Sequence, residues 1–283
     1  MSGTVVPYED ARVHVLSTAM KYAASVYEAM RAYWSDADQQ LYVFRLREHL
    51  RRLERSAKIA RIPLPADAAR LERETLEIVR ANDLHEDLHV RLIVFVDTDD
   101  GGLASREPVG YVIAPIPTTH YFDTPGLHVG VSSWHRTADN AIPARVKAAA
   151  NYQNSRLALN GDGSVAEGPG YTLFLVRDDQ PMTPSVTSNI LEGVTRSTLL
   201  TLFPESLGVA VEQREIDRTE LYVADEAFFA GTAAEVTPIL SIDRRPVGEG
   251  VMGPLTAKVR DAYFRSVRDG SAPHPEWRLP VYG

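Results

Sequence analysis

Residues 142–152 read IPARVKAAANY and contain Lys147, one of only four lysines in a chain of 283 residues. Small apolar residues follow this lysine, and residues 146–159 have a pattern that predicts a helix. A lysine among such neighbours is partly desolvated, which lowers the pKa of its amine and suits it to Schiff-base chemistry. The local sequence alone favours a second interpretation, in which Lys147 simply ends a surface helix.

The composition limits the class of protein. Hydrophobic residues make up 44% and charged residues 24%, which is typical of a globular chain. The absence of cysteine excludes disulfides, a thiolate nucleophile and cysteine-ligated metal. No run approaches ~18 apolar residues, and the N-terminus lacks a secretory signal pattern. The net charge of −8 disfavours a nucleic-acid partner. We therefore expect a cytoplasmic protein without membrane or nucleic-acid partners.

Strands and helices alternate over the first part of the chain. Strands are predicted at 25–33, 41–44, 90–96 and 110–116, and helices at 47–60 and 65–82. Residues 117–126, with two prolines and a glycine, are typical of a linker. Beyond them the sequence predicts strands at 127–133, 172–176, 209–216, 226–230 and 235–242, and helices at 146–159, 197–203 and 255–267. This alternation indicates two layered units.

Two pattern matches are expected to mislead. The stretch from His85 to His89 matches HExxH, but His89 leads directly into the predicted strand at 90–96. Strand positions four apart are ~13 Å apart, which is too far for a shared zinc ion. Residues 248–253 match GxGxxG, but a polar turn precedes them instead of the buried strand that dinucleotide binding needs. We therefore predict no metal site and no dinucleotide site.

Three further stretches indicate a small molecule that could be bound together with Lys147. Residues 165–170 place Glu167 beside glycines, just before a predicted strand. Residues 191–196 open a helix whose free N–H groups can hold a phosphate. Residues 230–235 form a tight turn of small residues whose amides can approach a ligand closely. A lysine, a carboxylate, a phosphate cradle and an amide-rich turn are what pyridoxal 5'-phosphate requires.

These stretches reveal a family resemblance over nearly the whole chain. The sequence resembles the fold-type IV pyridoxal-phosphate enzymes, and among them the branched-chain amino acid aminotransferases. The supporting stretches are 25–33 (SVYEAMRAY), 47–53 (REHLRRL), 145–152 (RVKAAANY), 164–168 (SVAEG), 189–196 (NILEGVTR) and 224–238 (ADEAFFAGTAAEVTP). The resemblance implies a mixed α/β (α+β) fold with two domains. Residues 1–121 would form a small α/β domain, 122–126 an interdomain linker, and 127–283 a large cofactor-binding domain with a pseudo-barrel sheet.

The resemblance also implies the cofactor contacts. Lys147 would be the Schiff-base lysine and proton shuttle, Glu167 would pair with the pyridine nitrogen, and Tyr152 would hydrogen-bond the phenolic oxygen. The remaining contacts would hold mainly the phosphate. The implied cofactor-binding residues are Arg52, Lys147, Tyr152, Glu167, Leu191, Gly193, Val194, Thr195, Gly231 and Thr232.

The resemblance further implies the substrate contacts. The turn of Thr232, Ala233 and Ala234 would receive the α-carboxylate, and Arg91 would act with two tyrosines on the distal carboxylate of glutamate. One of these, Tyr121, would come from the partner subunit, which implies a homodimer. The implied substrate-binding residues are Tyr22, Tyr27, Ala29, His89, Arg91, Tyr121, Thr232, Ala233 and Ala234.

Several positions near the expected substrate differ from the family pattern. Tyr27 replaces a phenylalanine and Ala29 a glycine, and the added hydroxyl and methyl group should narrow and polarise an aliphatic pocket. His89 replaces a tyrosine and, as a histidine, can titrate near neutral pH. Thr118 replaces a tryptophan, and the Tyr171–Thr172 pair replaces Glu-Asn. Between Leu159 and Asn160 the family has a turn and a strand that this sequence lacks. Such changes typically alter selectivity by ~1–3 kcal/mol and leave the reaction in place.

The expected function is transfer of an amino group between an L-amino acid, branched-chain or otherwise hydrophobic, and 2-oxoglutarate in amino-acid biosynthesis. Another enzyme on the same scaffold is an alternative, namely a D-amino acid or amine transaminase or an aminodeoxychorismate-lyase-like enzyme. A cofactor-free binding or structural homologue is an alternative of a different class.

Overall fold

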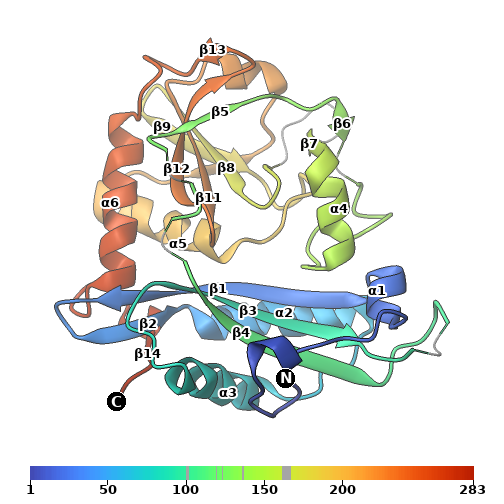
Figure 1. Ribbon diagram of the computed structural model, residues 1–283. Coiled ribbons are helices and arrows are strands. Elements are labelled where there is room, and N and C mark those ends of the chain that lie inside the picture. The colour runs from blue at the N-terminus through green and yellow to red at the C-terminus, as the bar shows by residue number, and fades with distance from the viewer. Residues whose placement is uncertain (100–101, 119, 123, 136, 161–166) are drawn as a thin grey trace. The chain divides into compact units, whose positions relative to one another are not determined.

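The computed structural model describes the chain except residues 100–101, 119, 123, 136 and 161–166 (Figure 1). Its contacts divide into two compact units. The first comprises Met1–Thr119, Val146–Asn151 and Val267–Gly283, and the second His120–Arg145 and Tyr152–Ser266. Two segments that the sequence analysis assigned to the large domain, 146–151 and 267–283, thus group with the first unit. The predicted domain boundary at 121–126 stays a prediction.

The first unit contains a five-stranded antiparallel sheet in the order β14-β2-β1-β3-β4. Helices α2 and α3 lie against one side of this sheet (Figure 1). The elements are α1 (Thr18–Tyr22), β1 (Ser25–Ser35), β2 (Gln40–Phe44), α2 (Leu46–Ala60), α3 (Ala68–Ala81), β3 (Leu88–Val96), β4 (Val109–Pro117) and β14 (Arg278–Pro280).

The two faces of β1 have different neighbours. Side chains alternate along a strand, so Val26, Glu28 and Met30 point to one face and Tyr27 and Ala29 to the other. Val26 and Met30 belong to the apolar core with α2 residues such as Leu50 and Leu53. The face that carries Tyr27 and Ala29 therefore points away from α2.

The second unit contains a seven-stranded sheet in the order β10-β9-β8-β11-β12-β13, with β5 also paired to β12. A separate parallel pair joins β6 and β7. The strands are β5 (Leu127–Val129), β6 (Trp134–His135), β7 (Ala158–Asn160), β8 (Thr172–Arg177), β9 (Gln180–Pro184), β10 (Glu212–Arg214), β11 (Glu226–Gly231), β12 (Glu235–Ile242) and β13 (Arg245–Pro246). The longer helices are α4 (Ala149–Leu157), α5 (Val194–Leu202) and α6 (Pro254–Arg268), and short helical turns cover Tyr8–Asp10, Phe203–Leu207, Arg218–Tyr222 and Pro275–Trp277.

Three predicted elements have different limits in the structure. The helix predicted at 146–159 begins only at Ala149, so Lys147 precedes it. The strand predicted at 127–133 ends at Val129, because the Asp243 carboxylate accepts the Val131 N–H at 2.8 Å and replaces the ladder. The strand predicted at 209–216 is limited to Glu212–Arg214, the only three residues that pair with β9.

The expected loss of a strand between Leu159 and Asn160 is also corrected. A three-residue strand, β7, spans this position and pairs in parallel with β6. The preceding helix α4 ends at Leu157, one residue before β7 begins. The shortening therefore leaves a strand with no loop before it. Residues 164–166 of the family-like stretch lie outside the described residues.

Candidate active site

The main chain of Lys147 is held from two sides. Its N–H donates to Ser56 Oγ of α2 at 3.0 Å, and its carbonyl accepts the Tyr27 N–H of β1 at 2.9 Å. The residue is buried, with 8% of its surface exposed, and its Nζ lies 4.8 Å from the centroid of the Tyr27 ring. The interpretation as the end of a surface helix is therefore wrong. Lys147 is a buried lysine fixed by a helix and a strand.

One face of α2 carries a buried charged cluster. His49, Arg52 and Ser56 are three and four residues apart and so lie on one side of the helix. Nε and Nη2 of Arg52 donate to the two Glu28 carboxylate oxygens at 2.7 Å each, and His49 Nδ1 lies 2.7 Å from Glu28 Oε2. Glu28 has no exposed surface.

Electrostatics keep this buried carboxylate ionised. Burial by itself raises the pKa of Glu28, but the charge and hydrogen bonds of Arg52, with a smaller contribution from His49, outweigh it and lower the pKa to about 2. Burial also lowers the pKa of His49. The cluster is therefore an ion pair between Glu28 and Arg52, to which a histidine is hydrogen-bonded.

A second group of charged side chains lies on the opposite face of the sheet. The β1–β3 register places Ala29 opposite Arg91 and Arg31 opposite His89, so these four residues share the face of Tyr27. His89 Nε2 lies 3.4 Å from Arg91 Nη2, and the Arg91 guanidinium carbon lies 5.8 Å from the Tyr27 ring centroid. The structure thus brings together four predicted substrate residues: Tyr27, Ala29, His89 and Arg91.

The surroundings of His89 keep its imidazole neutral. Burial first, and then the positive charges of Arg91, Arg31 and Lys147, lower the pKa of His89 to about 4. Arg31 itself is 2% exposed and lies 3.6 Å from the Asp87 carboxylate, which also accepts two hydrogen bonds from Arg268.

The second unit contains a buried carboxylate next to a helix N-terminus. Glu167 is 6% exposed, and its Oε2 accepts the Leu191 N–H at 3.2 Å. Helix α5 begins two residues after Glu192, and its N-cap residue Gly193 provides no side-chain hydrogen bond. The first amides of α5, which belong to Val194 and Thr195, therefore have no side-chain cap.

The turn between β11 and β12 has no room for larger side chains at its start. A Cβ atom on Gly231 would lie 3.1 Å from the Gly170 carbonyl oxygen. Thr237 Oγ1 donates to the Ala234 carbonyl at 2.5 Å, which fixes the far side of the turn. Glu235 follows with a φ of 55°, so the chain reverses there. Thr232, Ala233 and Ala234 occupy the turn between these fixed points.

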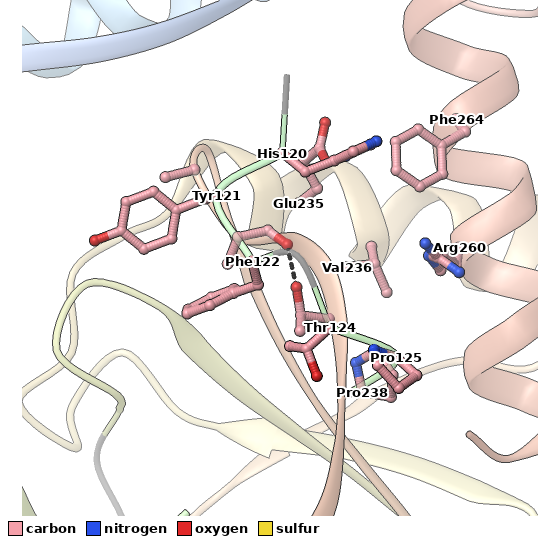
Figure 2. Close-up of a pocket in the computed structure, with 13 residues that line it drawn as sticks. His120, Tyr121, Phe122, Thr124, Pro125, Glu235, Val236, Pro238, Arg260 and Phe264 are labelled. Atoms are coloured by element: carbon pink, nitrogen blue, oxygen red, sulfur yellow. Dashed lines mark hydrogen bonds and ion pairs between the residues drawn. The ribbon is translucent and has the colours of Figure 1, made fainter. Parts of the chain in front are cut away.

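Part of this turn lines a cavity of about 70 Å³ within the second unit (Figure 2). The cavity is enclosed by the start of β12 with the turn before it (Ala233–Pro238), by two α6 side chains, and by His120, Tyr121, Phe122, Thr124 and Pro125. His120 Nδ1 lies 3.7 Å from Glu235 Oε2, and Figure 2 shows the Tyr121 ring directed away from Arg260 and Phe264. Tyr121, Ala233 and Ala234 are thus grouped in this unit.

The remaining predicted tyrosines are more dispersed. Tyr152 lies beside Gly170, whose added Cβ would be 3.6 Å from the tyrosine ring. Tyr22 ends α1 in the first unit and is 46% exposed. The Tyr171 ring packs against Tyr121, Phe122 and Phe229, and burial together with the Tyr121 hydroxyl raises the pKa of Tyr171.

Sequence reasoning did not assign roles to Glu28, His49, Ser56, Arg31 and Asp87. The first three could have been found from the strand alternation of 25–33 combined with the three- and four-residue spacing in 49–56. The HExxH match has no metal-like geometry, since His89 lies in β3. Within the described residues no group of three or more His, Cys, Asp or Glu side chains is arranged for a metal, and no helix could cross a membrane.

The comparison with protein families decides the classification. A family model described as amino-transferase class IV matches residues 25–242. The chain belongs to the class IV aminotransferases. It is therefore a transaminase of the fold-type IV, pyridoxal-phosphate-dependent class, and the predicted family and fold class are confirmed.

Individual relatives extend over almost the whole chain. A probable branched-chain-amino-acid aminotransferase of Aquifex aeolicus is 38% identical over 296 residues, covering 99% of this chain and 95% of the relative. The branched-chain aminotransferase of Thermoproteus uzoniensis, crystallised with norvaline, has a TM-score of 0.93 at 39% identity and covers 99% and 98% of the two chains. The branched-chain amino acid aminotransferase of Thermobaculum terrenum, in its PLP-bound holo-form, has a TM-score of 0.92 at 37% identity, with 99% and 96% covered.

Proposed function

We propose that this class IV aminotransferase transfers the amino group of a branched-chain or other hydrophobic L-amino acid to 2-oxoglutarate. The observation that carries the proposal is the buried Lys147, held by Ser56 and Tyr27 in the position that the family motif assigns to the reactive lysine. Relatives named branched-chain-amino-acid aminotransferase match nearly the full length of the chain.

The residues fit pyridoxal phosphate. Glu167 is a buried acid of the kind that keeps a pyridine nitrogen protonated. The start of α5 has amides without a side-chain cap, which suits a phosphate. Arg52 supplies a buried guanidinium whose orientation Glu28 fixes through two hydrogen bonds. At Gly231 the turn approaches Gly170 so closely that an added Cβ atom would lie 3.1 Å from the Gly170 carbonyl oxygen, so this position of the turn carries no side chain.

Each side chain then has a proposed task. Pyridoxal phosphate, when bound, supplies an aldehyde and a ring that accepts electrons from the substrate Cα. Lys147 Nζ would hold the group in the resting enzyme, take the α-proton of the amino acid, and return it to C4′. Tyr152 would donate to the phenolic oxygen. The amides of Val194 and Thr195 would hold the phosphate.

The substrate would be held at its two ends. The turn of Thr232, Ala233 and Ala234 would receive the α-carboxylate, because small residues let a ligand approach the backbone closely. Arg91 would receive the distal carboxylate of glutamate. We also propose that the enzyme works as a homodimer in the cytoplasm, and that Tyr121 of each subunit extends into the substrate site of the other subunit.

A specialised activity on the same scaffold is favoured by one observation. Tyr27, Ala29 and His89 share one sheet face, and each differs from the family pattern. The Tyr27 hydroxyl and the Ala29 methyl group reduce the room for a long aliphatic side chain on that face, and the imidazole of His89 makes it more polar than a purely aliphatic surface. A D-amino acid transaminase, an amine transaminase or an aminodeoxychorismate-lyase-like enzyme is therefore the second candidate.

Spectroscopic half-reactions test the proposal. Purified enzyme loaded with pyridoxal phosphate is mixed with single amino donors, namely L-leucine, L-glutamate, D-alanine and an aryl-alkyl amine, and the loss of the cofactor's visible absorbance is followed. We expect the two L-amino acids to react and Lys147→Ala to be inactive. Reaction with only the D-amino acid or the amine would support the second candidate. Protein that stays colourless with added cofactor would contradict both and indicate a cofactor-free homologue.

A further inference from the structure

Arg91 differs from the buried arginines of the first unit in its surroundings. Arg31 lies beside the carboxylate of Asp87, and Arg52 donates twice to Glu28. Among the described residues, Arg91 has no carboxylate within ion-pair distance, and its side chain is exposed. Its side chain contacts the ring of Tyr27 and Nε2 of His89.

The chemistry of the His89 contact fixes the state of the imidazole. A guanidinium has only donors, so Nε2 of His89 must be the acceptor and the ring proton must lie on Nδ1. A protonated imidazole could not accept this bond and would repel Arg91. The burial of His89, at 9% exposed, and the positive charges of Arg91, Arg31 and Lys147 around it favour the neutral ring.

The geometry of the sheet links this contact to the reactive lysine. Lys147 Nζ and the Arg91 guanidinium lie 4.8 Å and 5.8 Å from the same Tyr27 ring. Both groups therefore lie near the sheet face on which the β1–β3 register also places Arg31 and His89. A substrate with a reacting carbon at Lys147 and a second carboxylate farther along its chain matches this arrangement of charge.

We propose that His89 is a positioning residue for Arg91, which it holds through Nε2 in the orientation that receives the distal carboxylate of a dicarboxylate substrate. His89 thereby determines how strongly the enzyme prefers a dicarboxylic over a monocarboxylic 2-oxo acid. The inference rests on the proposed function, because the contact between Arg91 and the distal carboxylate is part of it. It goes further by assigning the preference to a residue that differs from the family pattern.

The experiment compares His89→Leu with His89→Gln in the holoenzyme. Leucine removes the acceptor, whereas the glutamine Oε1 can replace Nε2. Each variant is loaded with the amino form of the cofactor and mixed with 2-oxoglutarate or 4-methyl-2-oxopentanoate. The limiting rate constant of this half-reaction (here kcat) and the half-saturating concentration of the oxo acid (here KM) are measured for each. His85→Leu is the matched control, because His85 lies in the same five-residue stretch but packs against Trp34 and Tyr282.

We expect His89→Leu to raise KM for 2-oxoglutarate more than it changes kcat. The ratio of kcat/KM for 2-oxoglutarate to that for 4-methyl-2-oxopentanoate should fall about tenfold, as for loss of a hydrogen bond to a charged group. His89→Gln should restore the ratio to within about threefold of wild type, and His85→Leu should leave it within about twofold.

Two results would overturn the inference. One is an unchanged ratio in His89→Leu, and the other is a His89→Gln ratio as low as that of His89→Leu. Failure of the proposed function looks different, because wild-type enzyme would then form an L-amino acid from neither 2-oxo acid. A variant that loses cofactor is recognised by its absorbance before kinetics are measured.

Discussion

Replacing Glu28 with the isosteric glutamine should lower the stability of the protein strongly, because it removes the charged partner of the buried Arg52. In Glu28→Gln the shape of the side chain is kept, but Arg52 loses its charged partner inside the protein. Removing one member of a buried pair costs about 3–5 kcal/mol. The pKa of Glu28 gives an independent figure, because a shift from 4.5 to about 2 corresponds to roughly 3 kcal/mol at neutral pH. We therefore expect Glu28→Gln to be destabilised by about 3 kcal/mol.

The structure also offers a matched control with the same chemistry. Arg47, on the same helix, donates twice to Glu72 at 2.9 and 3.1 Å, but the Arg47 side chain is 60% exposed. Exposed pairs contribute about 0–1 kcal/mol, so Glu72→Gln should lose less than ~1 kcal/mol. The assay is urea unfolding at pH 7, with protomer and cofactor concentrations held constant.

The contribution of the Glu28 carboxylate to stability should decrease at acidic pH. The pKa of Glu28 is lower in the folded than in the unfolded protein, so its contribution is fully present above pH 4.5 and declines as pH falls through about 2. The difference between wild type and Glu28→Gln should therefore be constant from pH 7 to 4.5 and shrink below it. Equal losses in Glu28→Gln and Glu72→Gln, or a difference that does not shrink in acid, would refute this reasoning.

Further predictions concern the second charged group and the cofactor cradle. The pKa of His89 falls from 6.5 to about 4 on folding, so the unfolded protein binds a proton in this pH window before the folded protein does. The free energy of unfolding of wild type, measured with urea, should therefore fall by about 3 kcal/mol relative to that of His89→Gln as pH drops from 6.5 to 4. Equal pH dependence of the two unfolding free energies would contradict this. Glu167→Gln should lower kcat of the half-reaction roughly 100-fold, because a neutral amide no longer stabilises the protonated ring nitrogen. Gly231→Ala should weaken cofactor retention on dialysis, because the added Cβ would lie 3.1 Å from the Gly170 carbonyl oxygen and displace the turn. Full retention would contradict the assignment of Gly231 to the cofactor site. Ala29→Gly should increase kcat/KM for L-leucine over that for L-alanine by several-fold, in competition assays.

Much of the fold could be predicted because local patterns and tertiary structure agree. The helix predicted at 47–60 became α2, Leu46–Ala60, because its apolar positions face β1. The helix predicted at 65–82 begins only at Ala68, where the Asp67 side chain accepts the Arg70 N–H and caps it. Strand β9 was missed because Pro181 and Pro184 interrupt any strand pattern. Strand β14 was missed because its only support is pairing with β2, far away in the sequence.

For the candidate site, short motifs suggest individual residues but do not show which side chains contact each other. Lys147, Glu167 and the turn at Thr232 lie in short motifs, so the sequence alone is enough to propose them as site residues, and their roles stay predictions. The partners of Arg52 and Arg91 depend on which residues share a sheet face, and a motif does not contain this information. Glu28 lies on the α2 face of β1, whereas Ala29, its neighbour, lies opposite Arg91. Neighbouring residues of one strand thus lie beside two different arginines, Arg52 and Arg91.

The most direct test of the central claim identifies the lysine that carries the coenzyme. Enzyme saturated with pyridoxal phosphate is reduced with borohydride, digested and mapped by mass spectrometry, which can distinguish all four lysines of the chain. We expect a phosphopyridoxyl group on the peptide that contains Lys147, in about one copy per chain. A modification found instead on Lys21, Lys58 or Lys258, or no stable modification at all, would contradict it.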